Sequence, residues 1–347
     1  MRVLYLVTSP RPVIAGTDAA FQEVAALQAA FNGEAVNLCP WATPGRPFPP
    51  QLYGFHRLAE IRRLERRCAI NHVFHSIPYR FPVLRFLRNP VVYTVLTSVG
   101  QLDKQPNLEW LASLHRIVVS NPRDAETLKS WGLSNYAVVP PAIETARLER
   151  SSLRLAEDLI LLMASAPWAE DQFDSKGVDA LLDAAARLPA LRLILLWRGV
   201  LLKELWARVE RRGLKDRVEI VPGHADINAH LKRAHATILA AKRSDVVKAY
   251  PHSLLESLAA GKPVILSDAL PMADYVRQNG CGIVVRKVND RTLIDAIGDM
   301  RARYDALAER ARLTDAQRFS YQAMIENYRA IYGFAAGDNG SPSRLKT

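Results

Sequence analysis

Short apolar runs alternate with longer amphipathic segments along most of the chain. In the first half, the runs rich in Val, Ile and Leu predict strands at residues 3–7, 35–38, 72–75, 91–96, 117–119 and 136–139. Segments of helical period between these runs predict helices at 19–31, 58–67 and 122–131. Buried strands that alternate with helices are typical of a parallel sheet with crossover helices.

The same alternation restarts after Pro140-Pro141 and the polar stretch ETARLERSS. Further strands are predicted at 159–163, 192–196, 218–221, 237–239, 264–266 and 283–285. Further helices are predicted at 176–188, 202–212, 227–234, 253–260, 271–279, 292–312 and 321–331. The pattern therefore predicts an α/β chain of two doubly wound domains facing a cleft, with ligands beyond the carboxyl ends of the strands.

This pattern sets the expected domain limits. We expect a first domain at 1–145, a second at 156–318, a helix at 319–335 that crosses back to the first domain, and a disordered polar tail at 336–347. The 347 residues are enough for two domains at about 150 residues each. The content of 49% apolar and 23% charged residues excludes a disordered, collagenous or coiled-coil protein.

The cysteines and the hydropathy of the chain indicate in which cellular compartment the protein resides. The three cysteines, Cys39, Cys68 and Cys281, lie far apart without metal-ligand spacing, so we expect neither a disulfide framework nor a zinc site. No window reaches the roughly 18 apolar residues needed to span a bilayer. These features favour a cytoplasmic protein that is not integral to the membrane. The formal net charge of +11 predicts a surface that attracts a polyanion, an anionic lipid or a phosphorylated small molecule as a partner.

The run SLLESLAAGKPV, residues 253–264, carries the most information about chemistry. Ser253 stands three residues before Glu256, which predicts a capping box and a helix that begins at Ser253 and ends at Gly261. The amides at the start of such a helix form an anion site. Glu256 then either caps the helix only or also binds ribose hydroxyls while the amides hold a diphosphate.

A second signal is Ser175-Lys176-Gly177, at the turn that opens the predicted helix 176–188. A lysine at a helix start is unfavourable with the helix dipole, so Lys176 indicates a bound anion that offsets the repulsion. The alternative is an ordinary solvated lysine. The acidic residues Glu170, Asp171 and Asp174 just before it are interpreted as a solvated turn rather than a metal site.

Together these segments resemble a known family. LLESLAAGKPVILSD, DSKGVDALLDAAARL, RIVVSNPRDAETLKSWGLSNYAVVPPAIE and the amino-terminal strand, loop with Gly16 and helix are similar to GT-B glycosyltransferases of family 4, over roughly residues 1–335. The resemblance implies two Rossmann-like domains and a retaining hexosyltransferase. It implies transfer of a sugar from a nucleotide diphosphate donor to a glycan, lipid-linked or small-molecule acceptor, as in polysaccharide biosynthesis, without a metal or other cofactor.

The resemblance also assigns site residues. It implies that the donor is bound by Gly16, Lys176, Lys248, His252, Ser253, Leu254 and Glu256, and that His75, Lys176 and Lys248 take part in catalysis. In this mechanism cations and helix amides stabilise the charge on the leaving diphosphate.

The sequence departs from the family at three places. Family members carry two glutamates eight residues apart; Glu256 matches the second, and Lys248 stands in place of the first, which suits an unusual donor, such as an acidic one, or a sugar held otherwise. Family members carry an arginine after the strand at 159–163 that neutralises the diphosphate, and this sequence has none there. Lys248 or Arg198 is the candidate for this second positive charge. The family's histidine after the fourth strand is replaced, which leaves His75 as the candidate there, with packing under a loop as its alternative.

Residues 57–88 contain eight arginines against Glu60 and Glu65, a local net charge of +6. Aromatic and apolar residues lie between the arginines, which suits docking to an anionic membrane surface. An ordinary basic outer helix is the alternative.

Other functions have less support. A nicotinamide-dependent oxidoreductase would need a G-x-G-x-x-G turn after the first strand of a domain, and neither half has one. A nucleic-acid-binding protein lacks any accompanying recognition motif, so we expect no nucleic acid partner. A degenerate GT-B protein, which binds a nucleotide sugar or a partner without turnover, is the remaining alternative.

Overall fold

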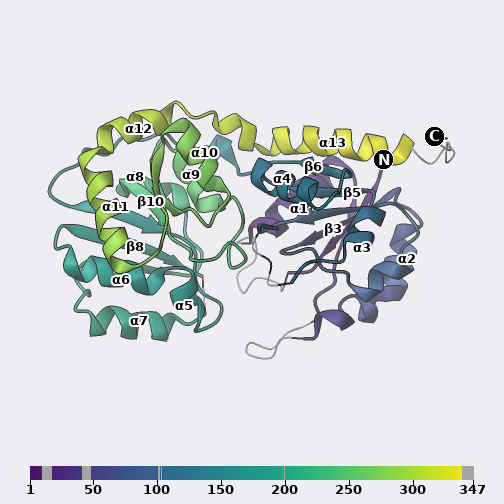
Figure 1. Ribbon diagram of the computed structural model, residues 1–347, viewed down its shortest axis with the longest axis horizontal. Helices are drawn as coiled ribbons and strands as arrows, with labels where there is room; N and C mark the ends of the chain where they lie inside the picture. The colour runs from purple at the N-terminus through teal and green to yellow at the C-terminus, as the bar shows by residue number, and fades with distance from the viewer. Residues whose placement is uncertain (10–17, 41–47, 101, 103, 199, 338–347) are drawn as a thin grey trace. The chain divides into compact units, whose positions relative to one another are not determined.

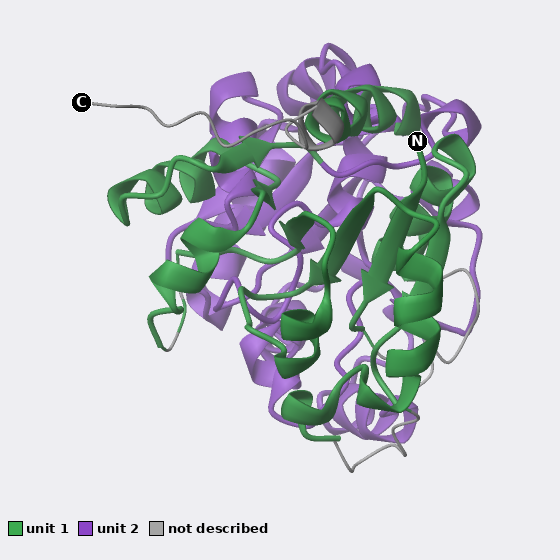
Figure 2. Cartoon of the chain, turned by 90° about the vertical axis from the view of Figure 1, so that its right-hand side faces the viewer, with its two compact units in different colours: residues 1–12, 18–140, 321–347 green, residues 13–17, 141–320 purple. Residues whose placement is uncertain are grey.

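The computed structural model describes residues 1–9, 18–40, 48–100, 102, 104–198 and 200–337 (Figure 1). These residues form two compact units, coloured green and purple in Figure 2. Unit 1 comprises the described residues up to 140 together with 321–337, and unit 2 comprises residues 141–320. The chain therefore leaves unit 1 at Pro140 and returns to it at Tyr321.

Unit 1 is built on a parallel sheet ordered β2-β1-β3-β4-β5-β6. Its strands are β1 (Val3–Val7), β2 (Glu34–Asn37), β3 (Ile70–His75), β4 (Val91–Val95), β5 (Arg116–Val119) and β6 (Tyr136–Val138). Its α-helices are α1 (Ala19–Ala30), α2 (Leu58–Glu65), α3 (Leu108–Ser113), α4 (Pro122–Ser130) and α13 (Tyr321–Gly337). Short 3₁₀ turns occur at η1 (Pro50–Leu52), η2 (Phe55–Arg57) and η3 (Pro82–Phe86).

Successive side chains of a strand point to opposite faces of a sheet, and in unit 1 helices cover both faces. Leu4 and Leu6 of β1 belong to one apolar cluster together with residues of α2, α3 and α4. Tyr5, between them, points to the other face, where its hydroxyl donates to Leu27 O of α1. Helix α13 packs on α1 and β3. Strands buried on both faces explain the continuous apolar runs in the sequence.

Unit 2 repeats the plan with a parallel sheet ordered β12-β11-β10-β7-β8-β9. Its strands are β7 (Leu159–Met163), β8 (Leu191–Trp197), β9 (Val218–Pro222), β10 (Ala236–Leu239), β11 (Val264–Ser267) and β12 (Gly282–Val285). Its α-helices are α5 (Gln172–Ser175), α6 (Val178–Arg187), α7 (Leu202–Arg211), α8 (Ile227–Arg233), α9 (His252–Ala259), α10 (Met272–Asn279), α11 (Asp290–Ala302) and α12 (Tyr304–Arg312). Two 3₁₀ turns are η4 (Thr145–Arg147) and η5 (Ala316–Phe319).

The core of unit 2 also lies on both faces of its sheet. Helices α6, α7 and α11 pack in one cluster with Leu161, Leu193 and Ile238. Helices α9 and α10 cover the opposite face at β10 and β11, and α8 covers it at β7 and β8. The predicted doubly wound arrangement of parallel strands is confirmed in both halves of the chain.

Strand order determines where ligands can bind in each sheet. In unit 2 the chain runs from β7 to β8 and β9 on one side, then crosses to β10, which pairs with the other edge of β7. The loops after β7 and β10 therefore diverge at the carboxyl edge, the usual ligand position in such sheets. The equivalent point in unit 1 lies between β1 and β3.

Three predicted helices differ from the structure in more than a shift of one or two residues at an end. The segment predicted as one helix at 292–312 is two helices, α11 and α12, which meet at Arg303. The segment predicted to become helical at Lys176 contains the short α5, which ends at Ser175, and then α6 from Val178. The last helix continues to Gly337, beyond the predicted end at residue 331, so part of the expected tail is helical. Residues 338–347 lie outside the described residues.

Candidate active site

Lys176 lies in the turn between α5 and α6, at the carboxyl edge of the unit 2 sheet. Its Nζ donates a hydrogen bond of 2.8 Å to Ala166 O in the loop that follows β7. The residue is only 4% exposed, and burial lowers the pKa of its ammonium group to about 8. Lys176 is the C-cap residue of the short α5 and directly precedes Gly177, the N-cap residue of α6, so it lies in the turn that opens α6.

Backbone contacts attach this turn to the end of β10. Gly177 has a φ of +74°, and a Cβ at this position would lie 2.1 Å from Ala240 O. Only glycine fits such a close approach in the left-handed region. Lys242 N donates to Ser175 O over 2.8 Å, and Lys242 Nζ pairs with Asp174 at 2.5 Å. The Lys176 turn therefore lies directly against the segment that follows β10, at the switch point.

Helix α9 begins one residue earlier than predicted and without the predicted capping box. Its N-cap is Pro251, which forms no side-chain cap, and Ser253 is already in the first turn. The amides of Leu254 and Leu255 both donate to Pro251 O, at 3.1 and 3.2 Å. Proline has a φ suited to this position, so it starts the helix in place of Ser253. The first turn, with His252, Ser253 and Leu254, presents the positive end of the helix dipole.

Glu256 lies in the second turn of α9 and does not cap the helix. Its side chain is 12% exposed, and Oε1 lies 3.5 Å from Nη2 of Arg147. Burial raises the pKa of the carboxyl group to about 7, against the opposing charges of Arg147 and Arg198. The interpretation of Glu256 as only a helix cap is therefore wrong.

The sequence did not reveal Arg147 as a neighbour of Glu256. Arg147 belongs to η4, in a polar connecting stretch without a motif, so only the tertiary structure brings it to α9. Arg198, which directly follows β8, was considered only as a second positive charge for the diphosphate. Its charge acts on Glu256.

Lys248 lies between β10 and α9 and is half-buried. It therefore belongs to the same connection as the α9 start, on the carboxyl side of the sheet. Lys176, Lys248 and Glu256 thus come from the connections and helix around one switch point of unit 2.

His75 ends β3 in unit 1, at the switch point of that sheet. Its Nδ1 is hydrogen-bonded to Thr8 Oγ1, and its ring packs edge-on against Phe81 with centroids 4.8 Å apart. Burial lowers the pKa of the imidazole to about 4, so the ring is neutral at physiological pH. Gly16, the other site residue predicted for this half of the chain, lies outside the described residues.

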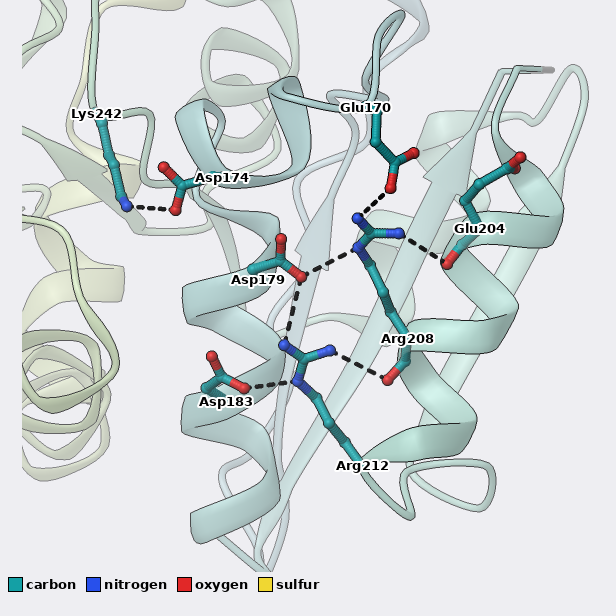
Figure 3. Close-up of polar contacts among 8 residues, drawn as sticks. All are labelled: Glu170, Asp174, Asp179, Asp183, Glu204, Arg208, Arg212 and Lys242. Carbon is teal, nitrogen blue, oxygen red and sulfur yellow. Dashed lines mark hydrogen bonds and ion pairs between the residues drawn. The ribbon is translucent and has the colours of Figure 1, made fainter.

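The acidic residues before Lys176 form ion pairs. Glu170 pairs with Arg208 at 2.6 Å and Asp174 pairs with Lys242, as Figure 3 shows. Within the described part of the chain, no group of three or more His, Cys, Asp or Glu residues is arranged to hold a metal ion. The three cysteines are all buried and form no disulfide.

Two parallel six-stranded sheets flanked by helices define the fold as GT-B, and solved structures agree. Sucrose-phosphate synthase from Thermosynechococcus elongatus has a TM-score of 0.71 at 15% identity, over 97% of this chain and 100% of that one. Anabaena HepE in complex with UDP and glucose has a TM-score of 0.72 at 16% identity, over 96% of this chain and 100% of that one. At this identity the likeness concerns the fold.

Sequence comparison agrees with this fold. Residues 171–319, within unit 2, match the family described as "Glycosyl transferases group 1". D-inositol 3-phosphate glycosyltransferase from Mycobacteroides abscessus is 28% identical over 183 residues. That match covers 50% of this chain and 40% of the mycobacterial enzyme's length.

Proposed function

We propose that this chain is a retaining family 4 glycosyltransferase of the hexosyltransferase type. It transfers a sugar from a nucleotide diphosphate sugar to a glycan, lipid-linked or small-molecule acceptor, in the cytoplasm and in polysaccharide biosynthesis. The observation that carries the proposal is the packing of the Lys176 turn against the segment after β10, at the unit 2 switch point and within the group 1 match.

The charges around that switch point support a donor diphosphate. Lys176 supplies an ammonium group and the α9 start supplies backbone amides, two groups that bind phosphate well. Lys248 is a second cation on the same connection, and Glu256 offers carboxylate oxygens for ribose hydroxyls. Anabaena HepE, which shares the fold, has also been solved in complex with UDP-glucose.

In this proposal the protein acts mainly on the leaving group. Negative charge grows on the diphosphate as the bond to the sugar breaks, and Lys176 with the α9 amides stabilises that charge. Because Lys248 stands in place of the family glutamate, we propose that a cation rather than a carboxylate contacts the donor sugar. We assign acceptor recognition to unit 1, near His75, whose neutral ring can accept or donate a hydrogen bond.

Replacement of Lys176 tests the proposal most directly. Lys176→Ala should lower turnover by roughly 10²- to 10³-fold with the fold intact, because it removes one charge-stabilising contact. Lys215→Ala is the matched control, since Lys215 is an exposed lysine of unit 2 that pairs with Glu210 and makes no contact with the Lys176 turn among the described residues. Turnover is measured as transfer or slow donor hydrolysis after a thermal-shift screen of nucleoside diphosphates and nucleotide sugars. Near-wild-type turnover of Lys176→Ala would contradict the proposal, and donor binding without any sugar release would indicate the degenerate alternative.

We further propose that the reaction needs no metal ion or other cofactor. Lys176 and the α9 start then neutralise the diphosphate by themselves. Turnover should be unchanged by a chelator and by added magnesium or manganese, and a loss with the chelator that magnesium restores would contradict this part.

The arginine-rich stretch, residues 57–88, supports peripheral contact with an anionic membrane surface. Its exposed arginines are Arg63, Arg66, Arg67, Arg80, Arg85 and Arg88. Glu60 pairs with Arg57 at 2.6 Å, and Glu65 is buried, with its Oε1 accepting from Asn71 Nδ2 and the amides of Arg88 and Asn89. Neither acid therefore neutralises the exposed arginines.

Exposed aromatic side chains accompany these charges. Phe55 and Phe86 are 38% and 40% exposed, and their rings meet edge to face with centroids 6.0 Å apart. Basic residues next to exposed aromatic ones suit the interface of an anionic bilayer. Among the described residues no helix has the length and apolarity to span a bilayer.

Vesicle sedimentation tests this contact. The protein should sediment with vesicles that contain anionic phospholipid and not with neutral ones, and salt should release it. Arg66→Gln/Arg67→Gln should weaken sedimentation, whereas Arg291→Gln/Arg303→Gln, which removes two exposed arginines from unit 2, should not. Equal loss of sedimentation in both double variants would show that net charge alone, and not this stretch, binds the vesicles. No sedimentation with either kind of vesicle would contradict the membrane contact and favour a dissolved acceptor.

A further inference from the structure

Arg208 joins three separate segments of unit 2 near the Lys176 turn (Figure 3). It lies on α7, and its side chain is 13% exposed. Its Nη2 donates to Glu170 Oε1 over 2.6 Å, its Nε to Asp179 Oδ1 of α6 over 3.2 Å, and its Nη1 to Glu204 O over 3.3 Å. The guanidinium carbon also lies 3.8 Å from the centre of the Phe173 ring in α5.

Two of these contacts fall on the segment that leads to Lys176. Glu170 lies in the loop after β7, and Phe173 is the buried anchor of α5, stacked on Trp197 with ring centroids 5.6 Å apart. Lys176 follows three residues after Phe173, and its Nζ is bonded to Ala166 O in the same loop. The loop, α5 and the lysine therefore form one closed segment that Arg208 holds from outside.

We propose that Arg208 is a positioning residue for Lys176: it holds the segment 166–176 so that the ammonium group stays enclosed and aimed at the switch point. Arg208 is too engaged with protein groups to contact a donor itself, so it acts through the lysine. The inference rests on the proposed function, because the benefit of a fixed lysine is the binding of a diphosphate.

A charged, nearly buried lysine is stable only if it keeps its carbonyl partner, here Ala166 O. If the loop moves away from Lys176, water replaces Ala166 O, and the flexible side chain samples many rotamers. Arg208 opposes this motion with a charge-assisted hydrogen bond, which is stronger than a neutral one, and with a planar cation over an aromatic ring. Small displacements of a charged group that contacts the substrate lower the rate of catalysis strongly.

Arg212 provides a matched control from the next turn of the same helix segment. Its Nη2 lies 3.4 Å from Asp179 Oδ1, and its Nε donates to Asp183 Oδ1 over 2.6 Å. Both acids belong to α6, so Arg212 connects α6 with α7 as Arg208 does, but among the described residues its hydrogen bonds do not reach the loop before Lys176 (Figure 3). Loss of either arginine weakens the helix pair, and only loss of Arg208 releases the loop.

The first measurement concerns donor binding and turnover. Arg208→Gln should lower kcat/KM for the donor and affinity for a nucleoside diphosphate by roughly 10- to 100-fold. Arg212→Gln should leave both within about threefold of wild type. Arg208→Lys should give an intermediate value, because lysine keeps the charge but cannot bind Glu170 and Asp179 together or stack its plane on Phe173.

A second variant keeps the test sound if Arg208→Gln folds poorly. Glu170→Gln changes an exposed residue, 62% exposed, that contacts Arg208 from the loop side. It should reproduce part of the Arg208→Gln effect, and the double variant should be no worse than Arg208→Gln alone, because both act through one contact.

The second measurement is independent of any donor. Deuterium labelling of backbone amides, read by mass spectrometry, reports how often residues 166–176 open to solvent. Labelling of this segment should be several-fold faster in Arg208→Gln than in wild type, and unchanged in Arg212→Gln.

The two measurements separate failure of the inference from failure of the proposed function. Equal labelling and equal affinity in Arg208→Gln and Arg212→Gln overturn the inference. Faster labelling in Arg208→Gln, together with no nucleoside diphosphate binding by the wild-type protein, overturns the proposed function and with it the donor role assigned to Arg208. Faster labelling with weaker binding in Arg208→Gln alone supports both.

Discussion

At the scale of single residues, burial shifts the pKa values of two groups of the candidate site toward neutral, one upward and one downward. The Glu256 carboxyl has its pKa raised to about 7, and the Lys176 ammonium has its pKa lowered to about 8. In both cases desolvation of the charged form is the largest cause. In the proposed function, the diphosphate needs Lys176 charged, and the ribose hydroxyls donate best to Glu256 as a carboxylate. We therefore expect the active form in a narrow pH range.

We predict a bell-shaped pH dependence of kcat/KM for the donor. Activity should rise through pH 7 as Glu256 loses its proton and fall above pH 8 as Lys176 loses its charge, because kcat/KM reports the groups of the free enzyme. The measurement is initial rate against pH at donor concentrations well below KM.

The variant Glu256→Gln isolates the acidic limb. An amide keeps a hydrogen-bond acceptor but does not titrate. Activity should be lower overall and flat below neutral pH, with the alkaline limb unchanged. An acidic limb that persists in Glu256→Gln would show that another group produces it.

At the scale of elements, helix α13 is attached to the unit 1 sheet by a buried chain of hydrogen bonds. The Tyr332 hydroxyl lies 2.5 Å from His72 Nδ1, His72 Nε2 lies 2.7 Å from Thr94 Oγ1, and Thr94 Oγ1 lies 2.9 Å from the Tyr328 hydroxyl. Burial lowers the pKa of His72 well below its usual range, so the ring is neutral. This chain links the last helix to strands encoded more than 200 residues earlier.

We predict that Tyr332→Phe destabilises unit 1 by about 1–3 kcal/mol, because it leaves a buried nitrogen of His72 without its partner. Tyr304→Phe is the matched control, since it removes a hydroxyl that donates to Leu153 O over 2.9 Å in unit 2. Urea unfolding monitored by hydrogen exchange should show the loss in unit 1 for the first variant and in unit 2 for the second. Destabilisation of the same unit by both would contradict the assignment of α13 to unit 1.

At the scale of the whole molecule, the two units have separate cores. The apolar cluster around β1 to β5 lies wholly in unit 1, and the clusters around β7 to β12 lie wholly in unit 2. Units with cores of their own can unfold in separate transitions. Ligand binding then stabilises only the unit that holds the ligand.

We predict that a nucleoside diphosphate stabilises unit 2 alone, by about 2.7 kcal/mol at a concentration 100 times its Kd. Calorimetry should resolve two transitions, assigned by the Tyr332→Phe and Tyr304→Phe variants, and only the unit 2 transition should rise. Lys176→Ala should abolish most of that rise. A shift of the unit 1 transition alone would place the nucleotide site in the other half of the chain.

Much of the fold could be predicted from hydrophobic pattern, because strands such as β1, β7, β10 and β11 are buried on both faces and are therefore largely apolar. β1 and β7 occupy their predicted residues, 3–7 and 159–163. The break between α11 and α12 at Arg303 was not predicted, since amphipathic character continues across it. The helix start at Pro251 was also missed, because the capping pattern of Ser253 and Glu256 is local and the real contacts of Glu256 are not.

The sequence alone determined the order of strands and helices, the division into two α/β halves, and the segments around Lys176 and Glu256, because hydrophobic period and short motifs are local properties of the chain. Only the tertiary structure decided that Arg147 and Arg198 act on Glu256, that Ala240 requires Gly177, and that Arg208 holds the loop of Lys176. Those contacts join residues far apart in the chain, and they depend on strand order and burial, which no local pattern encodes.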